Sequence, residues 1–368
     1  MKIIITGGGT GGHVYPALAI AKGIRDLIPN SELMYVGTKS GLEAKVVPKE
    51  GINFKTITVE GLPRVVSIQS LRSGFKLMAG LGESFKIISA FKPELIIATG
   101  GYVSGPIAWV GTQMGVPLVL HEQNSVPGKT NRLLAKRAKK ICLTFEDSKV
   151  YFKDRSKVKV TGLPIRDEIL LAAREASIKN LGLDPLKKTL LITGGSRGAH
   201  SINMAVVDAL PDLVLRQDLQ VILVTGERRY KETLHELENK GIKKASMGNI
   251  TIKPYLYHME HGLGCADMVV GRSGAAFLAE VTAKGIPSIL IPYPYAADNH
   301  QEYNAKSLVK AGASMVISDH ELNGQLLLDR LFSILDNKQK YEAMKKAALS
   351  MGKPDALSRI LREIQAII

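Results

Sequence analysis

Short apolar runs recur along the chain, and each is followed by a glycine-rich or polar turn. Residues 3–5, 95–98 and 118–120 are apolar at every position, without alternation between apolar and polar side chains. Uninterrupted runs of this length are typical of strands in a parallel sheet that helices cover on both faces. The pattern therefore predicts an α/β fold built from doubly wound parallel sheets.

The same pattern occurs twice in the chain. Residues 5–13 (ITGGGTGGH) align without a gap with residues 192–200 (ITGGSRGAH). Residues 94–101 resemble residues 267–274, where an apolar strand again leads into a turn that contains glycine. Repetition of this kind indicates two related domains. Because ligands of such sheets bind beyond the carboxyl ends of the strands, two domains facing each other would place their glycine turns across one cleft.

Glycine and proline in residues 160–165 (VTGLPI) mark the predicted boundary between the domains. We predict an amino-terminal domain over residues 1–163 and a carboxy-terminal domain over residues 164–340. Residues 341–368 are predicted to form a helix that packs back toward the amino-terminal domain.

The amino-acid composition excludes several classes of function. Aromatic side chains make up only 5% of the 368 residues, which argues against a nucleic-acid surface that stacks bases. The two cysteines exclude a disulfide scaffold, and no Cys/His cluster has the spacing of zinc ligands. We therefore expect neither nucleic acid nor a metal ion as a partner.

Positive charge is concentrated in the first half of the chain. The net charge is +15, and residues 1–164 carry 23 Lys and Arg against 11 Asp and Glu. This asymmetry predicts an anionic partner for the first half, although solubility alone is the alternative. Residues 61–92 interleave apolar and basic side chains and could lie on an anionic membrane surface, or form a helix packed on the sheet. Residues 96–120 are uncharged, but their glycines and prolines predict strand, turn, helix and strand, which excludes a membrane span.

The glycine turns suit phosphate groups. Residues 7–12 match the spacing of a dinucleotide fingerprint, but the second strand ends in residues 36–39 (VGTK) without the acidic residue that a dinucleotide site needs. A turn that opens a helix still presents backbone N–H groups at the positive end of the helix dipole. The copies at 7–13 and 194–200 therefore predict two anionic ligands. The alternative is glycine for tight strand–helix packing.

Polar residues after the strands are the candidates for chemistry. His13 could be a general base or only a capping residue of the turn. Residues 121–124 (HEQN) and 298–302 (DNHQE) follow apolar strands, and their amides suit sugar hydroxyls. Glu280, in the helix after the turn at 273–275, could accept from two ribose hydroxyls, or lie on a solvated helix face.

The chain lacks an Asp-x-Asp pair for a metal, so basic side chains and helix dipoles would have to hold a leaving pyrophosphate. Arg166, Arg197 and Arg272 are the candidates.

Taken together, the motifs resemble those of the MurG family of glycosyltransferases, in family order across almost the whole chain. They are GGGTGGH at 7–13, GGYVSGP at 100–106, HEQN at 121–124, GGSRGA at 194–199, RSGA at 272–275 and DNHQ at 298–301. The resemblance implies a GT-B fold of two Rossmann-like domains and an inverting transfer of N-acetylglucosamine that needs no metal ion. It implies UDP-N-acetylglucosamine as donor and undecaprenyl-pyrophosphoryl-N-acetylmuramoyl-pentapeptide (lipid I) as acceptor, giving lipid II. It also implies a peripheral enzyme on the cytoplasmic face of the cell membrane, in contact with anionic lipid.

The resemblance also assigns roles to single residues. His13 matches the family's candidate base, and Glu122 is a second candidate. Positions that match the donor site are Thr10, Gly11, Gly12, Asn124, Arg166, Ser196, Leu256, Ala275, Ala276, Phe277, Leu278, Ala279, Glu280 and Gln301. Candidates for the acceptor pyrophosphate are Gly9, Thr10, Gly101 and Tyr102. Arg197 stands where a common family variant has Gln.

Two other classes share some of these features. A UDP-N-acetylglucosamine epimerase-like enzyme could have the same fold and donor motif. A basic nucleic-acid-binding protein would explain the charge but not the duplicated glycine turns. The sequence indicates neither the oligomeric state nor the peptide chemistry of the acceptor.

Overall fold

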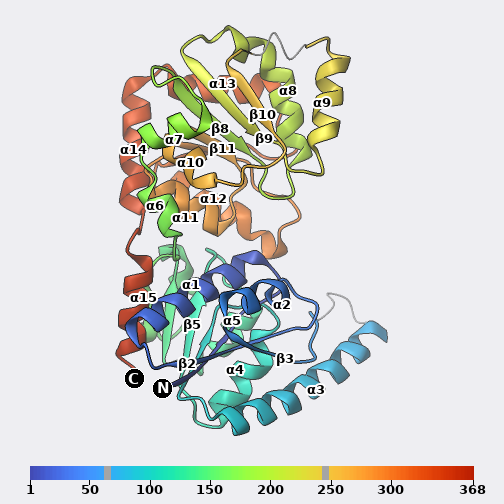
Figure 1. The fold of residues 1–368 in the computed structure, drawn as a ribbon, viewed down its shortest axis with the longest axis vertical. Coiled ribbons are helices and arrows are strands. Elements are labelled where there is room, and N and C mark those ends of the chain that lie inside the picture. The colour runs from blue at the N-terminus through green and yellow to red at the C-terminus, as the bar shows by residue number, and fades with distance from the viewer. Residues whose placement is uncertain (62–67, 243–247) are drawn as a thin grey trace. The chain divides into compact units, whose positions relative to one another are not determined.

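The computed structural model describes residues 1–61, 68–242 and 248–368, so residues 62–67 of the basic, apolar segment lie outside the described residues. The chain forms two compact units (Figure 1). Unit 1 consists of Met1–Pro164 together with Asp355–Ile368, and unit 2 consists of Ile165–Pro354.

Unit 1 is built on a seven-stranded sheet in the order β3-β2-β1-β4-β5-β6-β7, in which all neighbours are parallel. The strands are β1 (Lys2–Thr6), β2 (Glu32–Gly37), β3 (Asn53–Thr56), β4 (Leu95–Ala98), β5 (Leu118–Glu122), β6 (Lys140–Leu143) and β7 (Val158–Val160). The helices are α1 (Gly11–Leu27), α2 (Glu43–Val46), α3 (Ile68–Phe91), α4 (Ser104–Gln113), α5 (Lys129–Leu134) and α15 (Ala356–Gln365).

Unit 2 repeats this arrangement with a six-stranded parallel sheet in the order β10-β9-β8-β11-β12-β13. The strands are β8 (Lys188–Thr193), β9 (Leu219–Val224), β10 (Ile250–Lys253), β11 (Met268–Gly271), β12 (Ser288–Leu290) and β13 (Ser314–Val316). The helices are α6 (Asp167–Leu171), α7 (Arg174–Leu181), α8 (His200–Leu215), α9 (Tyr230–Asn239), α10 (Met259–Cys265), α11 (Ala275–Ala283), α12 (His300–Lys310), α13 (Gly324–Leu335) and α14 (Lys338–Met351).

Equivalent strands of the two sheets take equivalent places, since β1 and β8 each lie between the second strand and the fourth of their unit. The glycine turns of the sequence repeat follow β1 and β8. This topology confirms the prediction of two doubly wound parallel sheets.

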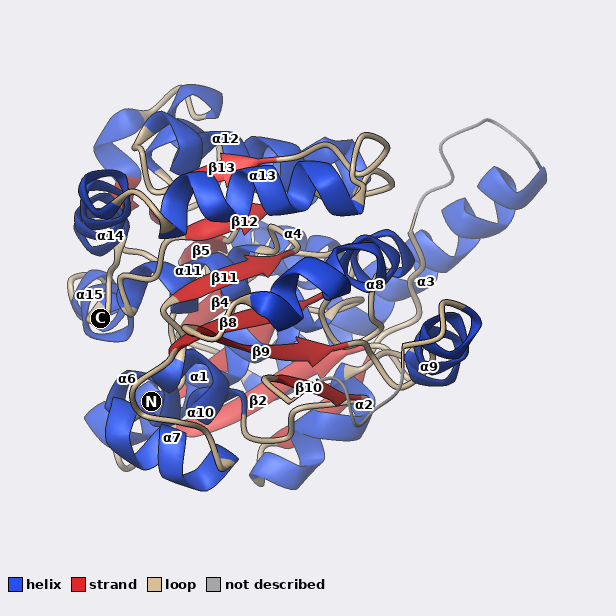
Figure 2. Ribbon diagram, turned by 90° about the horizontal axis from the view of Figure 1, so that it is seen from above, coloured by secondary structure: helices blue, strands red, loops and turns tan. Residues whose placement is uncertain are grey.

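Helices cover both faces of each sheet (Figure 2), which explains the uninterrupted apolar strands. In β1, Ile4 points into one core cluster while Ile3 and Ile5 point into another. In β8, Leu190 and Leu191 divide in the same way between two clusters. A strand with apolar contacts on both faces has no solvent side, so it carries no polar alternation.

The uncharged stretch from residue 96 to 120 forms β4, α4 and β5 in sequence, as predicted. Within the described parts of the chain, no helix combines the length and apolarity needed to cross a bilayer.

The carboxy-terminal segment forms two helices on different units. The chain leaves α14 at Gly352, and Pro354 precedes the short lead into α15. α14 packs against α11 and α13 of unit 2, whereas α15 packs against α1 and β6 of unit 1. Ile360 and Ile364 of α15 are completely buried in the core cluster that contains the inner face of α1.

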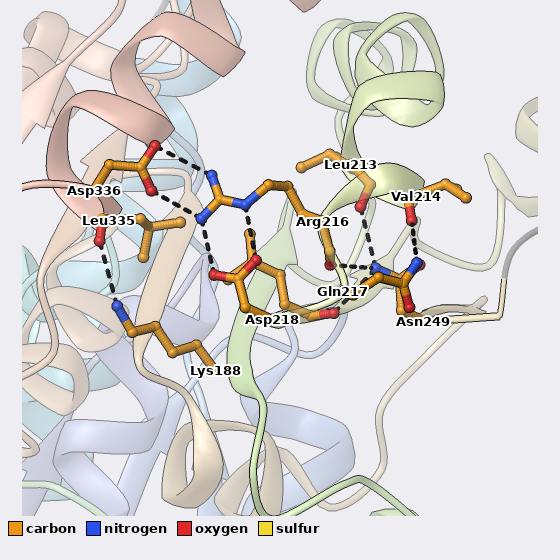
Figure 3. Close-up of polar contacts among 10 residues, drawn as sticks. Lys188, Leu213, Val214, Arg216, Gln217, Asp218, Asn249, Leu335 and Asp336 are labelled. Atoms are coloured by element: carbon orange, nitrogen blue, oxygen red, sulfur yellow. Dashed lines mark hydrogen bonds and ion pairs between the residues drawn. The ribbon is translucent and has the colours of Figure 1, made fainter.

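A polar cluster lies at the amino-terminal ends of β8 and β9 in the unit 2 sheet (Figure 3). The Arg216 guanidinium donates to both carboxylate oxygens of Asp218 and of Asp336, at 2.8–3.2 Å. These bonds hold the pKa of Asp218 below its usual range. The Asn249 amide donates to three backbone carbonyls nearby, those of Leu213, Arg216 and Leu219. The cluster bonds the carboxyl ends of α8 and α13 to the amino-terminal end of the sheet, which is opposite the glycine turns.

We expect the docking of α15 to stabilise unit 1 measurably. Ile360→Ala should lower the free energy of unfolding by about 2–5 kcal/mol, because truncating a fully buried isoleucine leaves a cavity. The fluorescence of Trp109, the only tryptophan, reports denaturation of unit 1. Leu186→Ala, at a side chain that is 93% exposed, should change stability by less than about 0.5 kcal/mol. Equal midpoints for Ile360→Ala and the unsubstituted protein would contradict a stabilising α15.

Candidate functional site

Two glycine turns of unit 1 touch through their backbones. The Gly8 N–H donates to the Gly100 carbonyl at 3.3 Å. Gly101 has a φ of +83°, and a Cβ there would lie 2.2 Å from the Gly8 carbonyl oxygen. Only glycine can therefore occupy position 101. This contact joins the turn after β1 to the turn after β4 and fixes where α1 begins.

A buried carboxylate lies under the first turn. Glu43 is fully buried and accepts from the Thr38 N–H at 3.0 Å, the Thr38 hydroxyl at 2.7 Å and the Gly9 N–H at 3.4 Å. Sequence reasoning missed Glu43, because nothing in the motifs links it to a turn 34 residues earlier. The Gly9 amide, predicted to meet the acceptor pyrophosphate, already has an acceptor. Gly11 and Gly12, in the first turn of α1, have amides that no intrahelical carbonyl reaches.

His13 lies in the first turn of α1, partly buried. Its Nδ1 atom is 3.0 Å from the Thr99 carbonyl oxygen and 3.0 Å from Gln123 Oε1. The Thr99 hydroxyl in turn donates to the His13 carbonyl at 2.8 Å. Thr99 was not predicted, although it opens the second glycine turn. A carbonyl oxygen can only accept, so Nδ1 carries a proton, and in the neutral ring the lone pair is then on Nε2.

Glu122, the second candidate base, organises the loop after β5. Its carboxylate is 1% exposed and accepts from the backbone N–H groups of Asn124 (2.9 Å) and Gly128 (3.1 Å) and from the Asn131 amide (2.8 Å). Both oxygens are thus occupied by bonds that shape the loop around Asn124. Tyr102 lies above the first turn, where a Cβ on Gly9 would be 3.1 Å from its ring.

Unit 2 contains a cavity of about 1100 Å³ at the carboxyl ends of its strands. The residues around it include Gly194–Ala199 of the glycine turn. They also include Arg166, Leu256, Phe277, Glu280 and Gln301, which the sequence predicted for the donor.

Two of these predicted residues form an ion pair across the cavity wall. Arg166 donates through Nε and Nη2 to Glu280 Oε1, at 3.3 and 3.2 Å. Burial raises the pKa of the Glu280 carboxyl, and the nearby guanidinium opposes that shift. The pair therefore holds a carboxylate that is only 14% exposed beside a guanidinium that is 53% exposed.

The run from Ala275 to Glu280 lies in the first two turns of α11, and its members differ in position. Gly274, Phe277 and Glu280 line the cavity, as three-residue spacing on one helix face requires. Leu278 is 1% exposed and Ala275 8%, so both side chains belong to the core. Ala276 and Ala279 are not among the residues that line the cavity.

Gln301 is held in place by an unusual backbone segment. Asp298 and Asn299 have φ values of +49° and +54°, in the left-handed region that non-glycine residues rarely adopt. Beyond them, Gln301 Oε1 accepts from the N–H groups of Ser273 (3.2 Å) and Tyr293 (3.0 Å). The amide nitrogen of Gln301 is the group that remains for a ligand.

Arg272 is bound to the protein itself. Its guanidinium donates to the carbonyls of Ile291 (3.1 Å) and Pro292 (3.2 Å) and pairs with Asp319. Asp319 also accepts from the Ser201 hydroxyl at 2.6 Å. Sequence reasoning missed Asp319, which joins the segment after β13 to Arg272 and to the first turn of α8.

Further cavity residues that the sequence did not indicate are two arginines after β9 and four tyrosines. They are Arg228, Arg229, Tyr255, Tyr257, Tyr293 and Tyr295. Arg197, in the turn, also lines the cavity. The cavity therefore carries an excess of positive charge at the amino end of α8.

The predicted residues thus fall into one group in each unit. Unit 1 holds the turn residues Gly9, Thr10, Gly11, Gly12 and His13, the second turn with Gly101 and Tyr102, and Glu122 and Asn124 after β5. Unit 2 holds the cavity group.

The chain resembles known proteins along almost its whole length. Residues 3–143 match the N-terminal domain of glycosyltransferase family 28, and residues 189–360 match its C-terminal domain. The crystal structure of Acinetobacter baumannii MurG has a TM-score of 0.79 and 26% identity, with 99% of both chains covered. The fold is therefore of the GT-B type, as the resemblance implied.

Two curated relatives carry the name UDP-N-acetylglucosamine--N-acetylmuramyl-(pentapeptide) pyrophosphoryl-undecaprenol N-acetylglucosamine transferase. The protein of Moorella thermoacetica is 48% identical over 364 residues, which is 99% of this chain and 98% of the relative. The protein of Desulforamulus reducens is 46% identical over 368 residues, which is 100% of this chain and 99% of the relative. Identity at this level over the full length shows that the chain belongs to the MurG family of glycosyltransferases.

Proposed function

We propose that this chain transfers N-acetylglucosamine from UDP-N-acetylglucosamine to the muramoyl 4-hydroxyl of undecaprenyl-pyrophosphoryl-N-acetylmuramoyl-pentapeptide. The product is lipid II, with inversion at the anomeric carbon. The names of the relatives support both substrates. The structural observation that carries the proposal is the unit 2 cavity, where a glycine turn, the amino end of α8 and Arg166 surround the buried carboxylate of Glu280.

The donor would lie in this cavity. The pyrophosphate would bind the Ser196 turn, where the amides of the α8 amino end and Arg166 supply positive charge. Glu280 would accept from the ribose hydroxyls, in place of its bond to Arg166. The backbone of Leu256 would meet the uracil, and the free amide nitrogen of Gln301 would donate to the sugar. Asn124 of unit 1 is a further donor contact in this proposal.

The chemical step needs one proton acceptor. His13 Nε2 would take the proton from the muramoyl hydroxyl, whose oxygen attacks the anomeric carbon as the bond to UDP breaks. Glu122 is less suited to this role, because its oxygens are occupied by the loop after β5. The helix dipole of α8 and Arg166 would stabilise the departing diphosphate.

The acceptor pyrophosphate would bind at the turns of unit 1, near Thr10, Gly101 and Tyr102. We propose the amides of Gly11 and Gly12 as its donors, because the Gly9 N–H already meets Glu43. No metal ion is required in this proposal. Among the described residues, no group of three or more His, Cys, Asp or Glu side chains is arranged so that it could hold a metal ion.

The reaction can be tested with labelled donor, a lipid I analogue and EDTA. We expect label to enter the lipid only when the acceptor is present, at a rate that EDTA does not lower. Isomerisation of the donor without acceptor would instead favour an epimerase. Tight donor binding without transfer would leave the cavity assignment standing and refute the acceptor.

Two substitutions separate the proposed roles of the units. His13→Ala should lower kcat by about 10²–10⁴-fold, the usual contribution of a general base, and change the KM for the donor little. Glu280→Gln should do the reverse and raise the KM for the donor, because the amide presents one acceptor oxygen instead of two. His235→Ala, at an exposed histidine of α9, is the matched control. Equal loss of turnover and donor affinity in His13→Ala would refute the base.

The enzyme would work at the cytoplasmic face of the membrane, and α3 supplies the surface in this proposal. Phe75, Met78 and Phe85 are 78%, 68% and 55% exposed and lie within one face of the helix. Lys86 is exposed beside them. Apolar side chains with neighbouring positive charge suit an anionic lipid surface.

Binding to phosphatidylglycerol vesicles in a sedimentation assay tests this surface. Phe75→Ser combined with Met78→Ser should lower the partition coefficient at least about tenfold, since each buried apolar side chain contributes roughly 1.5–3 kcal/mol. Leu186→Ser, at an exposed leucine of unit 2, should leave it unchanged. Undiminished binding of the double variant would refute the α3 surface.

A further inference from the structure

His121 is a buried histidine that the proposed chemistry does not use. It lies in β5, is 0% exposed, and has its Nε2 atom 2.9 Å from the Gly162 carbonyl oxygen. Because a carbonyl only accepts, Nε2 carries the proton. Burial lowers the pKa of His121 to about 4, so the ring is neutral at pH 7. Its Nδ1 atom is therefore a bare acceptor.

Gln123 lies between the two histidines and is 2% exposed. Its amide nitrogen is 3.0 Å from His121 Nδ1 and 3.1 Å from the His121 carbonyl oxygen. Both are acceptors, so the nitrogen of the amide must be on this side. The Oε1 atom then necessarily faces His13 Nδ1, at 3.0 Å.

If the side-chain amide of Gln123 were reversed, each of its contacts would pair two acceptors or two donors. It would set an oxygen against two acceptors of His121 and an N–H group against the N–H of His13, which the Thr99 carbonyl also holds at 3.0 Å. The orientation of Gln123 is thus determined by His121, and it adds a second acceptor for the Nδ1 proton of His13. On this account the Nε2 atom of His13 keeps its lone pair.

We infer that Gln123, oriented by His121, is a positioning residue that keeps the proton of His13 on Nδ1 and leaves Nε2 as the proton acceptor. The inference rests on the proposed role of His13 as base. The Gly162 carbonyl, at the end of unit 1, is the last member of this hydrogen-bonded series. His121 on β5 and Gln123 just after it would thereby determine which ring nitrogen of His13 carries the proton.

The tautomer can be observed directly by ¹⁵N NMR of the full chain labelled at its eight histidines. The spectrum of His13→Ala identifies the signals of His13. We expect a protonated Nδ1 and an unprotonated Nε2. A proton on Nε2 would overturn the inference. This measurement does not depend on catalysis, so it stays decisive even if His13→Ala remains active and the base proposal fails.

A matched pair of variants tests the kinetic consequence. Gln123→Met removes the three hydrogen bonds of Gln123, while Gln220→Met removes three bonds from a buried glutamine that is 5% exposed at the start of β9. We expect Gln123→Met to lower kcat about tenfold or more, with little change in the KM for the donor, and to add signal from the other His13 tautomer. Gln220→Met should keep kcat. Equal kcat values for the two variants would overturn the inference.

A second pair guards against variants that fold poorly. His121→Asn keeps an acceptor near the Nδ1 position for Gln123, whereas His121→Gln keeps only a donor near the Nε2 position for the Gly162 carbonyl. Each loses one buried hydrogen bond. We expect kcat to fall further in His121→Gln than in His121→Asn. The opposite order would overturn the role of His121.

Discussion

In each unit the candidate site residues depend on a backbone contact that is too close for any side chain. In unit 1 the turn after β1 touches the turn after β4, and a Cβ on Gly101 would lie 2.2 Å from the Gly8 oxygen. In unit 2 a Cβ on Gly198 would lie 2.0 Å from the Thr225 oxygen, at the end of β9. These contacts fix the first turns of α1 and α8, and with them His13 and the amides of the cavity. The duplicated glycines are therefore needed for packing, in addition to the anion binding that we propose for their turns.

Most of the fold could be predicted from the sequence, because the patterns that indicate strands, turns and the domain boundary are local. Each of these patterns spans only a few residues: the continuous apolar runs, the repeated glycine turn, and the glycines and prolines at the boundary. Together they predicted both parallel sheets. Ser196 could be predicted because it lies in the repeated turn, and Glu280 because it lies in the helix that follows the turn at 273–275. The family motifs then added Leu256 and Phe277, which no local rule distinguishes, and gave Arg166 and Gln301 a role at the donor.

The rest of the site depends on contacts between distant segments. Glu43 meets a turn 34 residues away, and Asp319 pairs with Arg272 from the end of the last strand. The partners of Gln123 include one that is 110 positions earlier in the chain. The role of such residues is defined by the partner, so composition and spacing do not reveal them. Helix periodicity also distinguishes Glu280 from Leu278 only once it is known which face of α11 meets the core.

The return of α15 to unit 1 has a consequence for synthesis on the ribosome. Unit 1 is made from two stretches of chain, and all of unit 2 is translated before Asp355–Ile368. Until then Ile20 and Ile24 of α1 lack two of their core neighbours, Ile360 and Ile364. The nascent amino-terminal half thus carries an uncovered apolar face throughout the translation of unit 2, where a chaperone could bind. Its folding is completed by a helix that is made only after unit 2.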